Sequence, residues 1–271
     1  MPELPEVQTI VNELETNLPG RKISSCHIIR ESIIQGDQSR FKKTVINKTI
    51  IRIDRIGKYI VFHLSAEIWI IAHLRMTGKF VLQPHSRSTH KHDRVIFELD
   101  NQLKLIFSDV RCFGTLELSN DLGKHKRLNQ LGLDPWSVQL SAKKLKKRFN
   151  TCTIPIKTAL LDQKIIAGLG NIYASEILFD SGINPRIPAN KLSEEKLSVI
   201  IKSMRKILRQ ALKYNGTSIS DYRRVDEKQG MFQNFLKVYG KVDQKCLNCS
   251  SKIEKIVQNQ RSTFLCPICQ K

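Results

Sequence analysis

The chain opens with Met1-Pro2-Glu3-Leu4-Pro5-Glu6-Val7, and this stretch predicts how the first domain begins. Pro5 suits the first turn of a helix, where a missing backbone N–H costs nothing. Apolar residues then recur at helical spacing up to the stop signal Pro19-Gly20, at Val7, Ile10, Val11, Leu14 and Leu18. The stretch therefore predicts an amphipathic helix. On spacing alone, starting this helix is a sufficient reason for both prolines.

The same stretch carries reactive groups. Trimming of Met1 before a small residue would expose Pro2 as a free secondary amine. A chain amine has an ordinary pKa of about 8, so part of it is neutral and nucleophilic at pH 7. Its iminium adduct with a sugar carbon would act as an electron sink. Glu3, beside the amine, and Glu6, one turn on, would supply carboxylates for proton transfer.

The amino-acid composition indicates what kind of partner the protein binds. The 271 residues are enough for two domains with a core each. Lys and Arg number 45 against 25 Asp and Glu, giving a net charge of +20. Such a balance favours a polyanionic partner, although a solvated basic surface, as in ribosome-associated proteins, would give the same numbers.

Hydropathy and cysteine usage predict a cytosolic protein. The N-terminus has two glutamates and no apolar run, and no stretch approaches 18 apolar residues, so we expect neither a signal peptide nor a membrane span. Three scattered thiols, Cys26, Cys112 and Cys152, are expected to stay free in a reducing compartment.

Periodicity predicts an α+β fold in three parts. Short alternating segments with turn signals between them predict a β-sandwich or barrel after the first helix: Lys22–Ile29, Thr49–Leu64 broken at Gly57, Glu67–Leu74, Lys79–Leu82, Arg94–Leu99, Leu103–Ser108 and Phe113–Leu118. Beyond a linker near Pro135 the predicted helices are Ser141–Phe149, Ile156–Asp162, Asn171–Asp180 and Ser193–Lys213. We expect domains at 1–134, 135–232 and 233–271, with a duplex bound between the first two.

Four cysteines near the C-terminus have the spacing of a metal site. Two C-x-x-C pairs, Cys246 with Cys249 and Cys266 with Cys269, are separated by sixteen residues. Four thiolates at such spacing suit one tetrahedral, structural Zn²⁺ on a β-hairpin, which would be too small to fold without the metal. Two redox pairs or four idle thiols are the alternatives, and the spacing favours zinc.

Two further motifs suit nucleic acid. Gly168-Leu169-Gly170-Asn171 lets a backbone approach a phosphate, with Asn171 capping the next helix, although an ordinary turn and cap would look the same. The strings His73–Gly78 and Asp109–Gly114 follow separate strands, and their Met, Arg and Phe side chains suit filling the hole left by an extruded base. By composition alone, Met76 and Phe113 would instead be core residues.

These motifs together resemble the bacterial formamidopyrimidine-DNA glycosylase family of base-excision repair enzymes, within the endonuclease VIII superfamily. The resemblance spans nearly the whole chain, in four ordered motifs: the N-terminal string, the Met…Arg-x-Phe set, Gly-x-Gly-Asn and the zinc hairpin. Leu4 favours the oxidised-purine branch, because the endonuclease VIII branch usually has Gly there. Gln8, in place of an acidic residue, and Cys112 are small departures.

The resemblance implies roles for individual residues. The catalytic set would be Pro2, Glu3, Glu6 and Lys58, the last on phosphates around the active site. The void-filling and DNA-contacting set would be Met76, His92, Arg111, Phe113, Lys157, Asn171 and Arg261. A loop at Thr217–Gly230 would close over the extruded base.

The function implied is a bifunctional repair enzyme. It would excise 8-oxoguanine and formamidopyrimidines through a Pro2 Schiff base, then cleave the abasic strand by β- and δ-elimination. It would act as a monomer on double-stranded DNA with an oxidised purine or abasic site, in the bacterial cytoplasm at the nucleoid and without a membrane. The alternatives are a non-catalytic nucleic-acid-binding protein and an endonuclease VIII-like enzyme that prefers oxidised pyrimidines.

Overall fold

The computed structural model describes residues 1–218 and 222–271 and divides into two compact units. Unit 1 comprises Met1–Asn129 and Tyr214–Gln233, and unit 2 comprises Gln130–Lys213 and Asn234–Lys271. The 214–233 segment, expected in the helical domain, therefore groups with the N-terminal residues. Part of the expected capping loop, residues 219–221, lies outside the described residues. The boundaries of the three proposed domains stay a prediction.

Unit 1 begins with α1 (Leu4–Asn17), as the opening stretch predicts. A capping box at Glu3 and Glu6 starts the helix, and Pro5 lies in its first turn. The apolar face is buried in the main core of the unit, to which it contributes Val7, Ile10, Val11 and Leu14. The helix contacts strands β3 (Ile50–Ile56) and β4 (Tyr59–Leu64) and so packs against this sheet.

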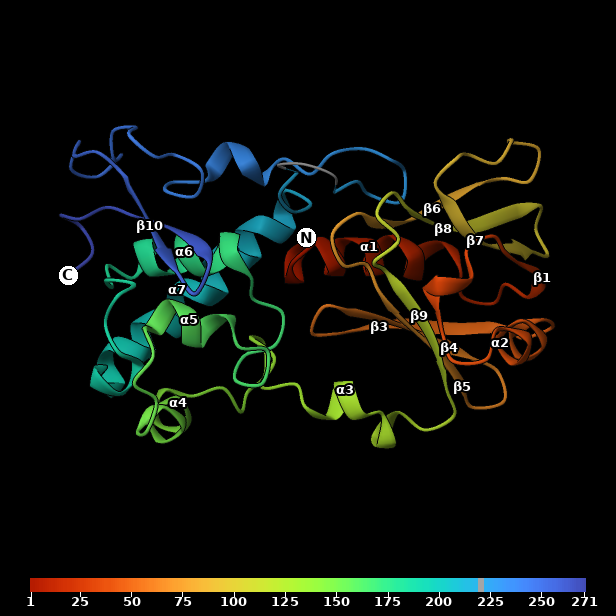
Figure 1. The fold of residues 1–271 in the computed structure, drawn as a ribbon, viewed down its shortest axis with the longest axis horizontal. Coiled ribbons are helices and arrows are strands. Elements are labelled where there is room, and N and C mark those ends of the chain that lie inside the picture. The colour runs from red at the N-terminus through yellow and green to blue at the C-terminus, as the bar shows by residue number, and fades with distance from the viewer. Residues whose placement is uncertain (219–221) are drawn as a thin grey trace. The chain divides into compact units, whose positions relative to one another are not determined.

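Two sheets follow α1 in unit 1 and confirm the predicted sandwich (Figure 1). One has the order β1-β7-β8-β6, with β1 Ile23–Ile28, β6 Gly78–Pro84, β7 Asp93–Leu99 and β8 Leu103–Asp109. The other has the order β2-β9-β5-β4-β3, with β2 Ile34–Gln35, β5 Ile68–His73 and β9 Thr115–Ser119. Neighbours pair antiparallel except β2 with β9. Phe62 of β4 and Phe80 of β6 join the two sheets edge to face, with ring centroids 5.2 Å apart.

Short helices in unit 1 lie where the sequence analysis predicts no element. Helix α2 (Gln38–Val45) starts at Asp37, whose carboxylate accepts the Arg40 N–H, and it buries Phe41 and Val45 one turn apart. Because the helix has only two buried apolar residues, its hydrophobic pattern is too short to be detected in the sequence. The other short helices of unit 1 are η1 (Glu31–Ile33), η2 (Leu122–Lys124) and α3 (Lys126–Asn129).

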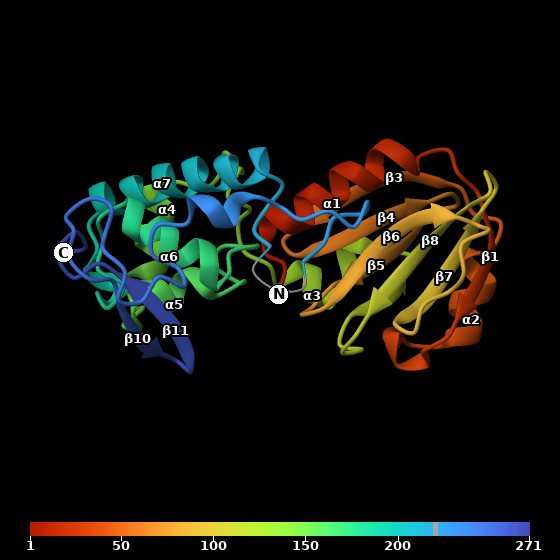
Figure 2. The same cartoon turned by 90° about the horizontal axis from the view of Figure 1, so that it is seen from above.

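Unit 2 contains the predicted helices, at α4 (Ala142–Phe149), α5 (Ile156–Leu161), α6 (Asn171–Asp180) and α7 (Glu194–Lys213). The 3-10 segment η3 (Ala189–Lys191) lies in this unit, and η4 (Phe232–Phe235) begins at the end of unit 1 and continues into unit 2. Helix α6 is buried along most of its length and contacts α5, α7 and strand β11 (Arg261–Leu265). β11 pairs with β10 (Glu254–Gln258) in a hairpin beside these helices (Figure 2).

The predicted α+β fold is therefore confirmed, with a sandwich, a helical region and a C-terminal hairpin. No helix among residues 1–218 and 222–271 is both long enough and apolar enough to span a membrane.

Candidate functional site

The start of α1 holds the proposed amine and both carboxylates in fixed positions. Pro2 is buried, and Glu3 and Glu6 are only 3% and 2% exposed. Glu6 Oε2 accepts the backbone N–H of Glu3 at 2.8 Å, while the Glu3 carboxylate accepts the backbone N–H of Glu6. Each acid thus fixes the backbone of the other. The residue that follows Pro2 is consequently held rigidly at the helix end.

Glu6 also links α1 to a segment more than 200 residues away. Its Oε1 accepts the backbone N–H of Thr217 at 2.8 Å. The preceding Gly216 has φ of +79°, and a Cβ added there would lie 2.8 Å from the same Oε1. Each oxygen of Glu6 therefore accepts a backbone N–H, and glycine is required at 216 on two grounds: its left-handed backbone and the close approach of Glu6. This geometry supports positioning as the main task of Glu6.

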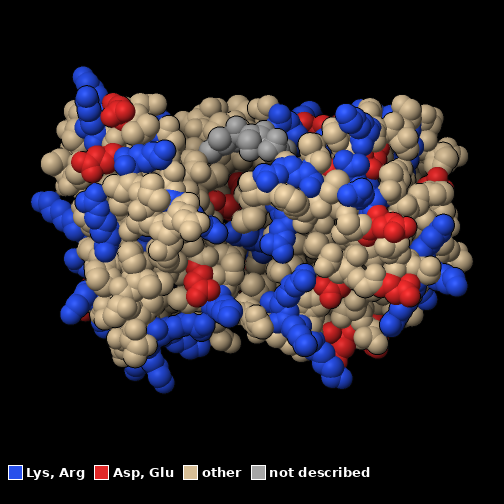
Figure 3. All heavy atoms as spheres, viewed as in Figure 1, with Lys and Arg blue, Asp and Glu red and all other residues tan. Residues whose placement is uncertain are grey.

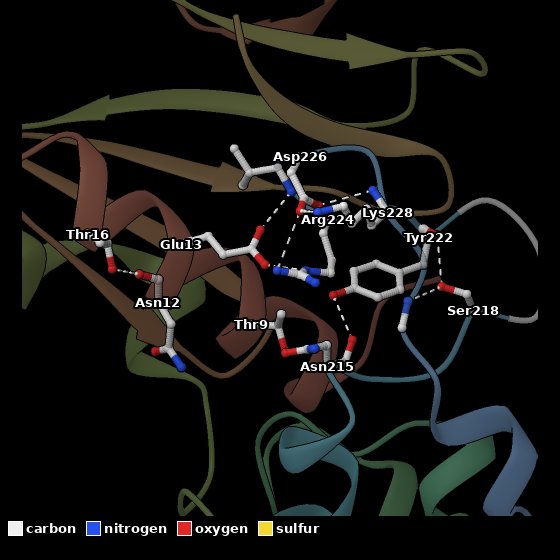
Figure 4. A network of polar contacts seen from close by, with 12 residues as sticks. Thr9, Asn12, Glu13, Thr16, Asn215, Ser218, Tyr222, Arg224, Asp226 and Lys228 are labelled. Carbon is white, nitrogen blue, oxygen red and sulfur yellow. Dashed lines mark hydrogen bonds and ion pairs between the residues drawn. The ribbon is translucent and has the colours of Figure 1, made fainter.

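The segment from Tyr222 to Lys228 docks on the same helix (Figure 4). The Arg224 guanidinium contacts the carboxylate of Glu13, and the Val225 N–H donates to Glu13 Oε2 at 2.8 Å. The Tyr222 hydroxyl donates to the carbonyl of Asn215 at 3.1 Å. Burial raises the pKa of Tyr222, and the negative charge of Glu6 raises it further. The end of the expected capping loop is thus fastened to α1 by the bonds of Arg224 and Val225 to Glu13, and the buried Tyr222 hydroxyl holds it to Asn215, which precedes it in the chain.

Lys58 lies at the turn between β3 and β4 and is 6% exposed. Arg55 supports this turn, since its Nη1 donates to the Gly57 carbonyl at 2.9 Å. The Nε of Arg55 in turn donates to Oε1 of Gln8 at 2.8 Å. Gln8 lacks the charge of the acidic residue usual in the family, but it still accepts a hydrogen bond from Arg55. Arg55 therefore still holds the turn that carries Lys58.

His73, at the end of β5, is a supporting residue to which the sequence analysis assigns no role. It is 8% exposed, its Nδ1 accepts the Arg75 N–H at 3.0 Å, and its ring packs edge-on against Tyr59 at 4.7 Å. Burial lowers the pKa of His73 to about 3, and the positive charges of Arg75 and Lys58 act in the same direction. The imidazole is thus neutral at pH 7 and serves as an acceptor that fixes the turn before Met76.

Met76, Arg111 and Phe113 lie on two turns at the ends of β5 and β8. Met76 is 40% exposed and Phe113 is 53% exposed, so the composition-based expectation that both are core residues is wrong. The guanidinium carbon of Arg111 lies 4.7 Å from the Phe113 ring centroid, a cation–π contact. Phe113 lies before β9 and not within it, because the Gly114 N–H is bound by buried Asp109 at 2.7 Å. Large apolar side chains held at a surface are typical of a binding face.

His92 lies next to these turns at the start of β7. Its ring Nδ1 lies 3.3 Å from Nη2 of Arg94, and its carbonyl accepts the Asp109 N–H at 2.9 Å. The ring is half-buried. The structure thus brings the backbone of His92 to the turn that holds Arg111.

Unit 2 brings Lys157 and Asn171 together against the β10–β11 hairpin. Lys157 is fully buried, and its Nζ donates to Asn171 Oδ1 at 2.5 Å and to the Ser262 carbonyl at 3.2 Å. The Nδ2 of Asn171 donates to the same carbonyl at 2.8 Å. The expectation that Asn171 caps α6 is wrong, because Gly170 occupies the cap position and the Asn171 side chain reaches the hairpin. Lys164 is exposed and makes no side-chain bond to this group in the described contacts.

Arg261 is exposed at the hairpin tip, directly before Ser262. The two residues of the turn, Asn259 and Gln260, both have positive φ, of 46° and 59°, as a tight type I′ hairpin turn requires. The three residues expected to bind phosphate in this unit, Lys157, Asn171 and Arg261, are therefore grouped around the Ser262 peptide. An exposed guanidinium beside a fixed amide suits a phosphate oxygen.

The four cysteine sulfurs form the one group of potential metal ligands found among the described residues, and all lie within 4.8 Å of one another. Cys246 Sγ lies 3.8 Å from Cys269 Sγ, and Cys249 Sγ lies 3.4 Å from Cys266 Sγ. A tetrahedral zinc with Zn–S bonds of about 2.3 Å would separate its sulfurs by about 3.8 Å. The cluster therefore fits one zinc ion. Apolar residues of the hairpin region pack with Phe179 of α6.

Positive charge is widely spread over the surface. On the face drawn in Figure 3, Lys and Arg are more prominent than Asp and Glu, which are scattered among them. This agrees with the net charge of +20. A net charge of this size and this face of the molecule suit a polyanionic partner.

Comparison with protein families covers most of the chain. Residues 1–116 match the formamidopyrimidine-DNA glycosylase N-terminal domain, and residues 131–223 match the formamidopyrimidine-DNA glycosylase H2TH domain. Residues 243–271 match the zinc finger found in FPG and IleRS. The three matches follow the order of the N-terminal helix and sandwich, the helical region and the cysteine hairpin.

Individual proteins are similar over the full length. A formamidopyrimidine-DNA glycosylase from Rickettsia conorii is 40% identical over 271 residues, which is 100% of this chain and 99% of the relative. A crystal structure of Lactococcus lactis FPG with Fapy-dG-containing DNA matches with a TM-score of 0.92 and 35% identity, covering 99% of this chain and 100% of that one. A complex of Lactococcus lactis Fpg with abasic-site DNA matches with a TM-score of 0.93 and 36% identity, covering 99% of each chain.

Proposed function

The chain belongs to the formamidopyrimidine-DNA glycosylase family, and from this membership we propose that it excises oxidised purines from duplex DNA and then cleaves the abasic strand. The observation that carries the proposal is the start of α1, where Pro2 is buried beside two interlocked carboxylates. The Lactococcus lactis structures are complexes with Fapy-dG-containing DNA and with abasic-site DNA, which supports damaged DNA as the substrate here.

The reaction begins once Met1 is removed and the Pro2 nitrogen is free. The nitrogen attacks C1′ of the damaged nucleoside, and the bond from C1′ to the base breaks with its electrons leaving on the base, which is then protonated. Glu3 serves the sugar ring oxygen, which takes up a proton as the ring opens to the iminium. Because hydrogen bonds to Glu6 fix Glu3, the Glu3 carboxylate loses little conformational entropy when the reaction begins.

The iminium then makes strand cleavage possible. It acidifies the 2′ hydrogens, so loss of one to a base such as Glu3 expels the 3′ phosphate in β-elimination. A second proton loss expels the 5′ phosphate in δ-elimination, and water releases the sugar remnant from Pro2. The product is a gap of one nucleoside. Lys58 would hold a phosphate near this centre, from a turn that Arg55 supports.

The remaining proposed residues bind the duplex. Met76, Arg111 and Phe113 would enter the space left by the extruded nucleotide, which agrees with their exposure and with the Arg111–Phe113 contact. Asn171 and Arg261 would bind phosphates, with Lys157 fixing Asn171, and His92 would contact the backbone near the void. We further propose that the protein acts as a monomer on bacterial nucleoid DNA in the cytoplasm.

Cys246, Cys249, Cys266 and Cys269 would hold one zinc ion, and the spacing of their sulfurs fits it. When bound, the metal supplies a structural crosslink. The chain's own residues then use that crosslink, because β11 carries Arg261 and the Ser262 carbonyl to which Lys157 and Asn171 donate. Zinc would thus keep the hairpin positioned without taking part in the reaction.

Borohydride trapping tests the proposal. Reduction during reaction with an 8-oxoguanine duplex should give a covalent protein–DNA adduct, and peptide mass analysis should place it on Pro2. A preparation that retains Met1 is the control and should give no adduct. Absence of an adduct, or full cleavage by the Met1-retaining protein, would show that the mechanism is wrong. A thymine glycol duplex should react more slowly than 8-oxoguanine, and the reverse order would favour the oxidised-pyrimidine specificity.

A further inference from the structure

Asp109 is buried between the two turns that present the proposed void-filling residues. It ends β8, pairs with Gly78 across the sheet and is 1% exposed. Its neighbour Val110 is 56% exposed, so the chain turns outward directly after it. None of the steps proposed above uses this carboxylate.

The carboxylate joins the two turns. Oδ1 accepts the hydroxyl of Thr77, which follows Met76, and it also accepts the backbone N–H of Arg111 at 3.1 Å. The Thr77 oxygen itself accepts the same Arg111 N–H at 3.1 Å. Asp109, Thr77 and Arg111 thus form a closed triangle of hydrogen bonds between the Met76 turn and the Arg111 turn.

The other atoms of Asp109 extend the link. Oδ2 accepts the Gly114 N–H at 2.7 Å, which closes the turn on the far side of Phe113. The backbone carbonyl of Asp109 accepts Nε of Arg94 at 2.7 Å, and its N–H donates to the His92 carbonyl at 2.9 Å. One residue therefore fixes the backbone on both sides of Phe113 and the strand start that carries His92.

Both turns contain a residue in a strained backbone conformation, and the hydrogen bonds to Asp109 and Thr77 offset this strain. Arg75 and Cys112, one in each turn, have φ of 53° and 55°, which side-chain-bearing residues rarely adopt. A Cβ at Gly114 would lie 2.5 Å from the Phe107 ring and 3.0 Å from Asp109 Oδ2. A simple Asx turn would need only the bond to Arg111. The bond to Thr77, 32 residues away, joins a second turn that an Asx turn does not involve.

We propose that Asp109 is a positioning residue for void filling: it holds Met76, Arg111 and Phe113 in register so that they enter the duplex together. This inference rests on the proposed function, because it assigns a cause to the placement of its void-filling set. The matched perturbation is at Thr77. Thr77→Val removes the hydroxyl with little change in shape, whereas Thr77→Ser keeps it.

A role of Asp109 in void filling predicts that its loss slows the reaction on duplex DNA but not on single-stranded DNA. Only a duplex leaves an orphaned base and a hole to fill, so void filling is unnecessary for an abasic site in a single strand. We expect Thr77→Val to lower the single-turnover rate on an 8-oxoguanine duplex by about tenfold, the effect of one lost hydrogen bond to a buried carboxylate. Asp109→Asn should lower the duplex rate further, because the new NH₂ group would face the N–H of either Arg111 or Gly114, which then loses its acceptor. Thr77→Ser should restore the rate.

Three readouts accompany the duplex rate. Borohydride trapping on a single-stranded abasic oligonucleotide should stay within about twofold of wild type for Thr77→Val and Asp109→Asn. Affinity for undamaged duplex should also stay constant, because phosphate contacts supply it. Val110→Ala, at the exposed position in the same turn, is the control and should react at the wild-type rate on both substrates.

The outcomes are distinct. If the wild type gives no trapped adduct on either substrate, the proposed function fails first. If the wild type traps and Thr77→Val cleaves duplex at the wild-type rate, the inference about Asp109 is overturned and the function stands. An equal loss on duplex and single strand would also overturn it, because the defect would then lie in the scaffold or the chemistry. Should Asp109→Asn fail to fold, the Thr77→Val and Thr77→Ser pair decides.

Discussion

The ammonium group of Lys157 lies 2.5 Å from Oδ1 of Asn171, and the Lys157 side chain is fully buried. Both side chains donate to the carbonyl of Ser262, next to exposed Arg261. We therefore propose that Lys157, which resembles a phosphate-binding residue, acts by holding Asn171 and does not itself contact phosphate. The buried cation fixes the Asn171 amide against the hairpin, and in the function proposed above it is this amide that would contact a DNA phosphate.

Replacing Lys157 with Met should weaken DNA binding without loss of stability. The lost bond to Asn171 should reduce affinity for an abasic-analogue duplex by about tenfold, roughly 1.4 kcal/mol. The melting temperature should fall little or rise, because a buried charge is costly to desolvate. Fluorescence anisotropy measures the affinity. In combination with Asn171→Ala, the double variant should bind about as weakly as either single variant, and fully additive losses would refute the coupling.

Glu6→Gln should destabilise unit 1 and slow trapping. A glutamine has one acceptor oxygen, so the N–H of Glu3 or that of Thr217 loses its partner. The expected loss is about 1–3 kcal/mol in the free energy of unfolding. Urea unfolding followed by circular dichroism measures it. Glu67→Gln, at an exposed position, is the matched control and should leave unfolding unchanged; an equal effect in both variants would contradict the proposed role of Glu6.

The pH dependence of stability should report His73. Its folded-state pKa of about 3 lies below the ordinary 6.5, so between these values the unfolded chain binds a proton that the folded chain does not. Stability from this residue is therefore complete above pH 6.5 and is lost as pH falls, by up to about 1.4 kcal/mol per pH unit.

His73→Gln keeps an acceptor for the Arg75 N–H and removes this titration. From pH 7 to pH 5 the wild type should lose about 2 kcal/mol more unfolding free energy than the variant. Urea unfolding at the two pH values measures both losses, and the carboxylates common to both proteins cancel in the difference. Equal losses in the two proteins would mean that the imidazole titrates normally when folded.

Cys249→Ser should release zinc and weaken DNA binding. Removing one of four thiolates lowers metal affinity, and the hairpin that carries Arg261 and Ser262 then loses its crosslink. Metal content by atomic emission and duplex affinity should fall together. Cys152→Ser, outside the cluster, is the control and should keep both. Undiminished DNA binding in a zinc-free Cys249→Ser protein would show that the hairpin is not part of the interface.

The dependence of DNA affinity on salt concentration should show that contacts to phosphates supply most of the binding. With roughly six phosphates neutralised, the slope of log affinity against log salt should be about −5. Arg261→Ala should make the slope less steep by about 1, because it removes one phosphate contact. A flat response in the wild type would contradict a phosphate-led interface, and an unchanged slope in the variant would remove Arg261 from it.

Local features of this fold could be predicted because their causes lie within a few residues. The spacing of Val7, Ile10, Val11 and Leu14 gives α1, and alternation gives most strands to within a few residues. The two C-x-x-C pairs give the metal-ligand cluster. Helix α2 was missed because two anchors, Phe41 and Val45, make too short a pattern. The residue roles were supplied by resemblance, since spacing alone left core packing as a sufficient explanation.

Local patterns in the chain were enough to predict most of the helices and strands and the group of four cysteines. Packing between distant segments sets which residues are exposed and which are enclosed by their neighbours. Phe113 faces out, Lys157 is enclosed, and Glu6 meets Thr217 across 211 residues of chain. The reason is physical: helix and strand periodicity reflect neighbouring residues, whereas burial and hydrogen-bond partners depend on packing between segments that the sequence keeps far apart.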